Sequence, residues 1–412
     1  MAITLINQKT GETVDFEDSE IGKALEEPVS IIEYVEKELA TFGDRPFSVV
    51  DSLVLAQTSY MDFSTAVPGM DSAGEGVAVS SLYRAEMFEK YTSATLMPPK
   101  NLELIKVLCA SPRFRDIKIN WFVSDSDARK EQQFCAMTFI LPTGQAYVCF
   151  RGTDTTINGW KEDFNISYLP ETEGQRQSAT YLNRHFVGRR GTLMTGGHSK
   201  GGNFAVYAAA MAAPGVRERI HRIYNNDGPG FREAFVSRAG YLSVRDKIVS
   251  IIPAGSVIGV LLANVPPHVV VASDAQGIVQ HDGFSWQVLG TDFVPGARTA
   301  LSLYIEDTLS RWIEGESDAD RRHFVDGLFD IFNEGLDQMD DLSNKRLVSL
   351  AKCVRALKNL PLDERQQFIK VTLDLLRQGG AVAGEKSETW LKGIEEKLPE
   401  IKLSLPDKLK KL

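Results

Sequence analysis

The chain has 412 residues, which favours two domains or one large domain with helical additions. Its composition, 43% hydrophobic and 25% charged, is typical of globular proteins, and its formal net charge of -9 disfavours electrostatic capture of nucleic acid or of an anionic membrane. No basic segment followed by an apolar one opens the sequence, and the most apolar stretch, 256–272, is interrupted by Pro266 and Pro267. We therefore expect neither a signal peptide nor a transmembrane segment, and a cytoplasmic protein.

The first 150 residues are expected to hold a short hairpin or tail, two helices and a pair of strands. Residues 1–20 are polar and turn-rich. Apolar residues at helical spacing predict helices within 20–42, after Pro28, and within 47–63. Two apolar runs on either side of the turn Pro142-Thr143-Gly144 predict strands at Phe134–Leu141 and Ala146–Phe150.

Strands and helices alternate in the middle of the chain. The expected elements are a helix near 175–189, a strand at 192–195, a helix at 204–211 and strands at 220–225, 247–252 and 269–272. Such an alternation implies an α/β fold with a mostly parallel sheet and helices on both faces.

No strand signal follows residue 298. Residues 301–378 read as amphipathic helices, with Ser317 and Asp320 as an N-cap pair. We therefore divide the chain into an N-terminal polar segment and helix at 1–45, an α/β domain at 46–298 and a helical C-terminal region at 299–412. That last region has two open roles: covering a site in the α/β domain, or mediating self-association or the binding of a partner.

The cysteines give no sign of a metal or a redox centre. The chain has four, Cys109, Cys135, Cys149 and Cys353, and none forms a C-x-x-C pair or lies at metal-ligand spacing from a histidine. We expect small buried hydrophobic residues in a reducing compartment, and no metal site.

The strongest motif is Gly197-His198-Ser199-Lys200-Gly201, between an apolar strand and an Ala-rich helix. This context is typical of the nucleophile elbow of α/β-hydrolases, in which the serine occupies a strained turn and glycines such as Gly197 and Gly201 leave room for the backbone. The N–H of Lys200, at the start of the helix, is then the natural oxyanion donor. The competing interpretation, a Gly-rich phosphate-binding turn, lacks dinucleotide or P-loop spacing.

A second motif, Phe150–Asp154, follows a predicted strand. Thr153 can offer both its N–H and its Oγ1 to an oxyanion. Taken alone, the motif is more readily a polar turn in which Arg151 pairs with an acid.

A serine nucleophile needs a histidine base, and in α/β-hydrolases this base follows the nucleophile and the acid in the sequence. The six histidines are His185, His198, His221, His268, His281 and His323. His281 is the candidate, because it lies in a loop after a predicted strand. His185 precedes the serine and His198 adjoins it. His221 and His268 start predicted strands, and His323 lies among the C-terminal helices. A loop histidine bound only to water is the simpler alternative.

The acid should follow a strand between residues 199 and 281. Asp227 does so, and Asp274, seven residues before His281, is the alternative. Asp227 has a purely structural alternative as well, which is to cap its turn through side-chain hydrogen bonds.

Taken together, these residues resemble a bacterial family of lipase-like α/β-hydrolases that is distantly similar to the class 3 lipases. The resemblance spans roughly residues 45–290 and rests on seven motifs: Asp51-Ser52-Leu53 to Tyr60, Gln133-Phe134, Phe150–Asp154, Gly159–Phe164, Gly197–Asn203, Asp227–Phe231 and Gln280–Trp286.

The resemblance implies that Ser199 is the nucleophile, that Thr153 contributes to an oxyanion hole and that Asp163 steadies the oxyanion turn. One departure stands out. Class 3 lipases carry the acid after a later strand, where this chain has Pro253–Ile258 without a carboxylate. Asp227, one strand earlier, must serve if the triad is complete.

The sequence thus predicts a serine hydrolase that cleaves a carboxylic ester, with a lipid or another acyl ester as substrate, through Ser199, His281, Asp227 and an acyl-enzyme. No cofactor is implied. Two alternatives remain: a catalytically silent hydrolase fold that acts as a binding or scaffold protein, and a serine hydrolase for a peptide or amide. The motifs do not define the acyl chain or the head group.

Overall fold

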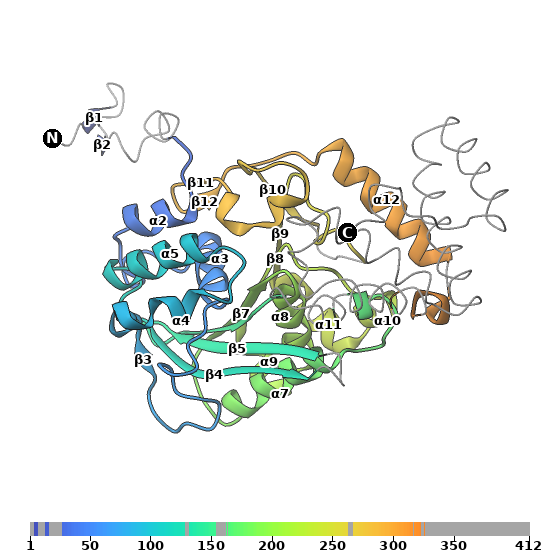
Figure 1. The fold of residues 1–412 in the computed structure, drawn as a ribbon, viewed down its shortest axis with the longest axis horizontal. Coiled ribbons are helices and arrows are strands. Elements are labelled where there is room, and N and C mark those ends of the chain that lie inside the picture. The colour runs from blue at the N-terminus through green and yellow to red at the C-terminus, as the bar shows by residue number, and fades with distance from the viewer. Residues whose placement is uncertain are drawn as a thin grey trace, which may run out of the picture.

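A computed structural model describes residues 4–6, 13–15, 27–127, 132–153, 162, 164–262, 267–315, 317–322 and 325. Its centre is an eight-stranded sheet in the order β10-β9-β8-β7-β6-β5-β4-β3 (Figure 1). The strands are β3 (Val77–Ala78), β4 (Lys118–Asp127), β5 (Gln132–Ile140), β6 (Ala146–Phe150), β7 (Leu193–His198), β8 (Ile220–Asn226), β9 (Ile248–Pro253) and β10 (Val269–Val271). Strands β6 to β10 are parallel and β3 to β5 are antiparallel, which confirms the expected α/β fold.

Two further strand pairs are short. Strands β1 (Thr4–Ile6) and β2 (Thr13–Asp15) pair antiparallel, as expected for a short N-terminal hairpin. Strands β11 (Val288–Leu289) and β12 (Asp292–Phe293) form a second antiparallel pair after His281.

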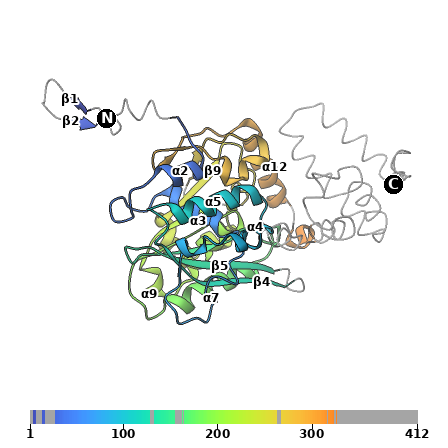
Figure 2. The ribbon, with the colours of Figure 1, turned by 60° about the vertical axis from the view of Figure 1, so that its left-hand side comes forward.

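Helices cover both faces of the large sheet, as Figures 1 and 2 show. They are α2 (Ile31–Lys37), α3 (Val49–Thr58), α4 (Phe88–Thr92), α5 (Pro98–Ala110), α7 (Glu173–Phe186), α8 (Lys200–Met211), α9 (Pro214–Arg217), α10 (Glu233–Val236), α11 (Ala239–Val244) and α12 (Ala300–Gly315). Successive residues of β6 point to opposite faces of the sheet. Tyr147 and Cys149 pack in one core with α2, α3 and α5. Val148 and Phe150 pack in the other core with α7, α8 and α11. The sheet is therefore buried on both sides, as parallel strands require.

Local sequence explains where several helices begin. Ser30, Ser48 and Thr172 each cap a helix, and the third helical residue returns the hydrogen bond to the cap. The helix expected within 20–42 extends over Ile31–Lys37, and the one expected within 47–63 over Val49–Thr58. Both are shorter than their apolar periodicity suggested: Ser30 and Ser48 fix their starts, and they end at Lys37 and Thr58, before the last apolar residues of the predicted segments.

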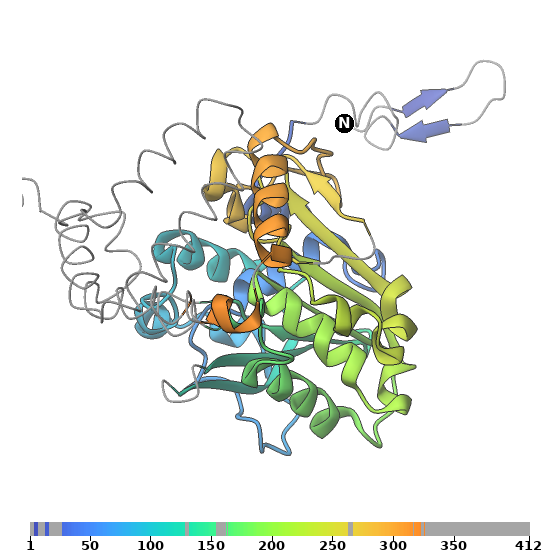
Figure 3. The same cartoon turned by 90° about the vertical axis from the view of Figure 1, so that its right-hand side faces the viewer.

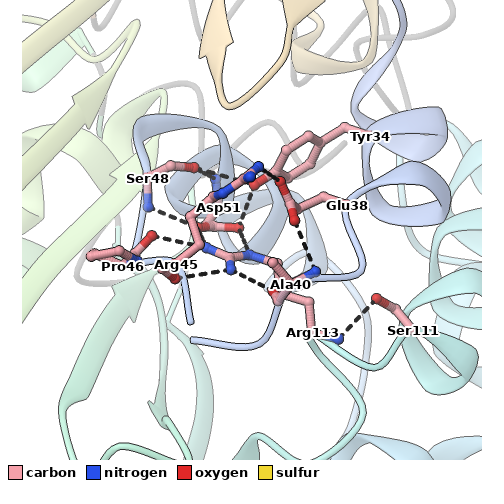
Figure 4. Close-up of polar contacts among 9 residues, drawn as sticks. All are labelled: Tyr34, Glu38, Ala40, Arg45, Pro46, Ser48, Asp51, Ser111 and Arg113. Carbon is pink, nitrogen blue, oxygen red and sulfur yellow. Dashed lines mark hydrogen bonds and ion pairs between the residues drawn. The ribbon is translucent and has the colours of Figure 1, made fainter. Parts of the chain in front are cut away.

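A fully buried ion pair links α3 to the segment that follows α5 (Figure 4). Arg113 contacts Asp51 through two nitrogens, at 2.6 and 2.9 Å, and neither side chain is exposed. The same guanidinium donates to the backbone carbonyls of Ala40, Arg45 and Pro46. All three guanidinium nitrogens of Arg113 therefore have hydrogen-bond partners inside the core.

The C-terminal region is described only in part. Helix α12 falls within the expected helical stretch, and Ser317 receives the N–H of Asp320 at 3.1 Å, as a cap does. The remainder of the predicted helices, and the cysteine at 353, lie outside the described residues, and the division at 45 and 298 stays a prediction. Within the described segments, no helix combines the length and the apolar composition needed to cross a membrane.

Candidate active site

The ends of three parallel strands meet at one edge of the sheet. Phe150 of β6 is paired with Gly197 of β7, and His198 of β7 with Asn226 of β8. The turns that follow these strands carry Thr153, Ser199 and Asp227. This edge, at the carboxyl ends of parallel strands, is where ligands bind in open α/β sheets.

Ser199 occupies a strained turn between β7 and α8. Its φ of 58° and ψ of -136° lie where non-glycine residues are rare, and its backbone N–H donates to Asn226 at 2.9 Å. Side chains at Gly197 or Gly201 would collide with the carbonyl oxygen of Phe150. The two glycines predicted to support the elbow therefore allow β6, β7 and α8 to approach.

The turn after β6 lies against the serine. A Cβ built on Gly152 would stand 2.9 Å from the Cβ of Ser199 and would collide with the Tyr60 hydroxyl. Thr153 follows, 6% exposed. The structure thus brings Thr153 to the neighbourhood of Ser199, whereas Asp163 lies outside the described residues.

His281 and Asp227 form a direct hydrogen bond. His281 Nδ1 lies 2.6 Å from Asp227 Oδ2, and Asp227 is fully buried. Because a carboxylate only accepts, the ring proton lies on Nδ1, which leaves the Nε2 lone pair to accept a proton. The capping role considered for Asp227 belongs to Asn225, whose Oδ1 accepts the N–H of Gly228 at 2.9 Å.

The alternative acid, Asp274, is exposed and accepts a hydrogen bond from Gln287. The loop that carries His281 is held instead through the residue before it, Gln280. Gln280 accepts the N–H of Gly255 through its side chain at 2.8 Å and the indole N–H of Trp286 through its carbonyl at 2.9 Å. The structure therefore brings Asp227, and not Asp274, to His281.

His198 has a role that sequence position alone did not reveal. Its Nε2 lies 2.7 Å from the carbonyl oxygen of His281, its Nδ1 lies 3.0 Å from the Tyr60 hydroxyl, and its ring centroid is 4.6 Å from that of His281. Burial and the neighbouring His281 lower the pKa of His198 to about 3, so the ring is neutral. The carbonyl then fixes the proton on Nε2, and Tyr60 donates to Nδ1.

A buried ion pair lies behind the serine. Lys200 Nζ is 3.1 Å from Glu162 Oε2, and both side chains are almost wholly buried. Glu162 also accepts the backbone N–H groups of Gln133 at 3.0 Å and Gly174 at 2.9 Å. This carboxylate joins β5, α7 and the start of α8. Its signal in the sequence is a lysine at the head of an otherwise apolar helix.

The remaining histidines lie in other surroundings. His185 stacks on Trp121, and burial lowers its pKa to about 4. His268 Nδ1 lies 2.9 Å from the Ser250 hydroxyl, and His221 is exposed. His323 lies outside the described residues. Over the part of the chain that the structure describes, no group of three His, Cys, Asp or Glu side chains is arranged to hold a metal ion.

Comparison with known proteins gives one match. The chain matches none of the curated proteins and none of the solved structures with which it was compared. A family model, Mbeg1-like, matches residues 108–330, a stretch that includes Ser199, Asp227 and His281. Because the match covers more than half of the 412 residues, the chain belongs to the Mbeg1-like family, a family reported as lipase-like.

Proposed function

We propose that this chain is a serine hydrolase of the esterase or lipase type, which cleaves a carboxylic ester through Ser199, His281 and Asp227. The observation that carries the proposal is the 2.6 Å contact between His281 Nδ1 and Asp227 Oδ2, at the sheet edge where Ser199 makes its strained turn. The contact supports a tautomer of His281 whose Nε2 can accept a proton, at the same sheet edge that carries the Ser199 hydroxyl.

In the proposed reaction, Ser199 Oγ attacks the ester carbonyl carbon and its proton passes to His281 Nε2. The N–H of Lys200 and the Thr153 turn stabilise the oxyanion, each donor contributing about 3 kcal/mol by analogy with known oxyanion holes. The C–O bond to the leaving alcohol then breaks, and His281 returns the proton to the alkoxide. A water molecule, deprotonated by His281, attacks the resulting acyl-enzyme, which releases the acid and restores Ser199.

A fluorophosphonate probe tests this function without knowledge of the substrate. We expect the wild type to be labelled, and Ser199→Ala and His281→Ala to lose labelling, because the probe reacts with serines activated by a base. Thermal denaturation checks that the variants fold. A folded wild type that stays unlabelled would contradict the proposal and favour a catalytically silent fold that acts in binding.

His198 and Tyr60 should act by holding the loop of His281. We expect His198→Gln and Tyr60→Phe to slow labelling by about tenfold, since small misplacements of a catalytic group are costly. The acid limb of the rate–pH profile should not move, because a group with a pKa of about 3 is neutral on both sides of that limb.

A matched control for these variants is His268→Gln, which removes a half-buried histidine that contacts Ser250. If His268→Gln slows labelling as much as His198→Gln does, the loss reflects general destabilisation and the positioning role of His198 is wrong.

A further inference from the structure

The first turn of α12 is hydrogen-bonded to the turn that follows β9. Figure 3 shows this helix, in orange, beside the yellow strands. The N–H of Thr299 donates to the carbonyl of Ala254 at 2.9 Å, and Ser302 Oγ donates to the carbonyl of Ser256 at 2.5 Å. Ser302 is 1% exposed, and its Oγ accepts from Arg298 Nε at 2.9 Å. A hydroxyl carries one proton, and Arg298 Nε can only donate. The Ser302 O–H therefore points to the carbonyl of Ser256.

The turn after β9 also contacts Asp227, the proposed acid. Ser256 Oγ donates to Asp227 Oδ1 at 2.5 Å, and the N–H of Gly259 lies 3.1 Å from both of these oxygens. A Cβ on Gly259 would collide with Asp227 Oδ1, so the turn fits closely around the carboxylate. One oxygen of Asp227 is thus held by the turn after β9, and the other faces His281.

We infer that Ser256 and Ser302 are positioning residues for the proposed triad, and that α12 tunes the acid through them. This inference rests on the proposed function of Ser199, His281 and Asp227. It gives the start of the C-terminal helical region a role in catalysis rather than only in covering the site. The turn 253–258 lacks the carboxylate expected from class 3 lipases. Its Ser256 hydroxyl instead supports Asp227, which follows the neighbouring strand.

The physical effect has a definite sign. Hydrogen bonds to Oδ1 disperse the negative charge of the carboxylate, so their loss concentrates that charge opposite His281 Nδ1 and favours the imidazolium form. The acid limb of the reaction, on which His281 must be neutral, should then move to higher pH.

Other titratable groups near the triad do not account for such a shift. Burial lowers the pKa of both His198 and His268, and the ion pair of Asp282 with Lys100 is the same in every variant. What differs is the support of Asp227 Oδ1: Ser256→Ala removes a hydrogen bond to that oxygen, and Ser302→Ala removes the bond that holds the Ser256 carbonyl.

The test uses the full chain and the rate of fluorophosphonate labelling between pH 5 and 9. We expect the acid limb to move up by about half a pH unit in Ser256→Ala, and in the same direction by less in Ser302→Ala, with labelling at pH 7 slower by about threefold to tenfold. The double variant should lose less than the product of the two single losses, because Ser302 reaches Asp227 only through Ser256.

Ser310→Ala is the matched control, since it removes a serine from the same helix just over two turns further on. A limb that stays in place in both Ser256→Ala and Ser302→Ala, as in Ser310→Ala, overturns the inference while leaving the function intact. A wild type that is not labelled overturns both.

A readout that does not need activity separates these cases further. The proton NMR resonance of His281 Nδ1–H, identified by its loss in His281→Ala, should shift in Ser256→Ala and Ser302→Ala but not in Ser310→Ala. An unchanged resonance in both serine variants contradicts the coupling even where labelling slows.

Discussion

Asp227→Asn should slow the reaction of Ser199 by about 10⁴-fold, the scale found when the acid of a Ser-His-Asp triad becomes an amide. The reason is the tautomer of His281. Asp227 Oδ2 now keeps the ring proton on Nδ1, at 2.6 Å, and an amide that turns its NH₂ group to the ring would move that proton to Nε2. A ring with its proton on Nε2 cannot accept one from Ser199. The rate of fluorophosphonate labelling measures the effect.

Asp274→Asn is the control for this substitution, since Asp274 was the alternative acid and is exposed. It should label at the wild-type rate. If Asp274→Asn lost labelling and Asp227→Asn kept it, the acid would be wrongly assigned.

Arg113→Ala should lower the free energy of unfolding by about 3–5 kcal/mol, the cost of removing one partner of a buried ion pair. The change leaves Asp51 charged and buried with Tyr34 as its remaining side-chain neighbour at 2.9 Å, and leaves three backbone carbonyls without their donor. Urea denaturation followed by circular dichroism measures the loss.

Two further variants separate charge from packing at this site. Arg113→Met keeps most of the side-chain volume and should still destabilise, whereas Arg245→Ala, which removes an exposed partner of Asp246, should cost less than about 1 kcal/mol. Similar losses for Arg113→Ala and Arg245→Ala would contradict a structural role for the buried pair.

The parallel part of the fold was predictable because its strands are continuous apolar runs between turn signals. The strand Ala146–Phe150 was predicted with the bounds that the structure has. The elements between residues 64 and 131 were not predicted, and they include β3, α4, α5 and β4. Helix α5 begins with two prolines, and β4 carries Asn120 and exposed polar residues near its end, with a residue of positive φ, Trp121, in its middle. The buried residues of α5, at 101, 104, 105, 108 and 109, do follow helical spacing, so the sequence carries a signal for this helix, whereas β4, interrupted by a bulge after Asn120, shows no clean alternation.

The candidate site was predictable only as far as strand ends and chain order determine it. They select Ser199, His281 and Asp227, and the structure brings the last two into contact. They do not show that His198 holds the His281 loop, or that Ser256 faces Asp227, because such contacts depend on how side chains from distant segments are oriented. The segment 154–161 and Asp163, which bear on the predicted oxyanion turn, lie outside the described residues.

The hydrogen bonds around the site join segments that are far apart in the chain. Tyr60 and His198 are separated by 138 positions, His198 and His281 by 83, and Ser52 and Asn226, which bond behind the elbow at 3.1 Å, by 174. Closing such long loops costs entropy that is recovered only when the intervening strands are in place. We therefore expect the constellation to form late in folding, so that a nascent or partly folded chain holds Ser199 without the groups that would activate it.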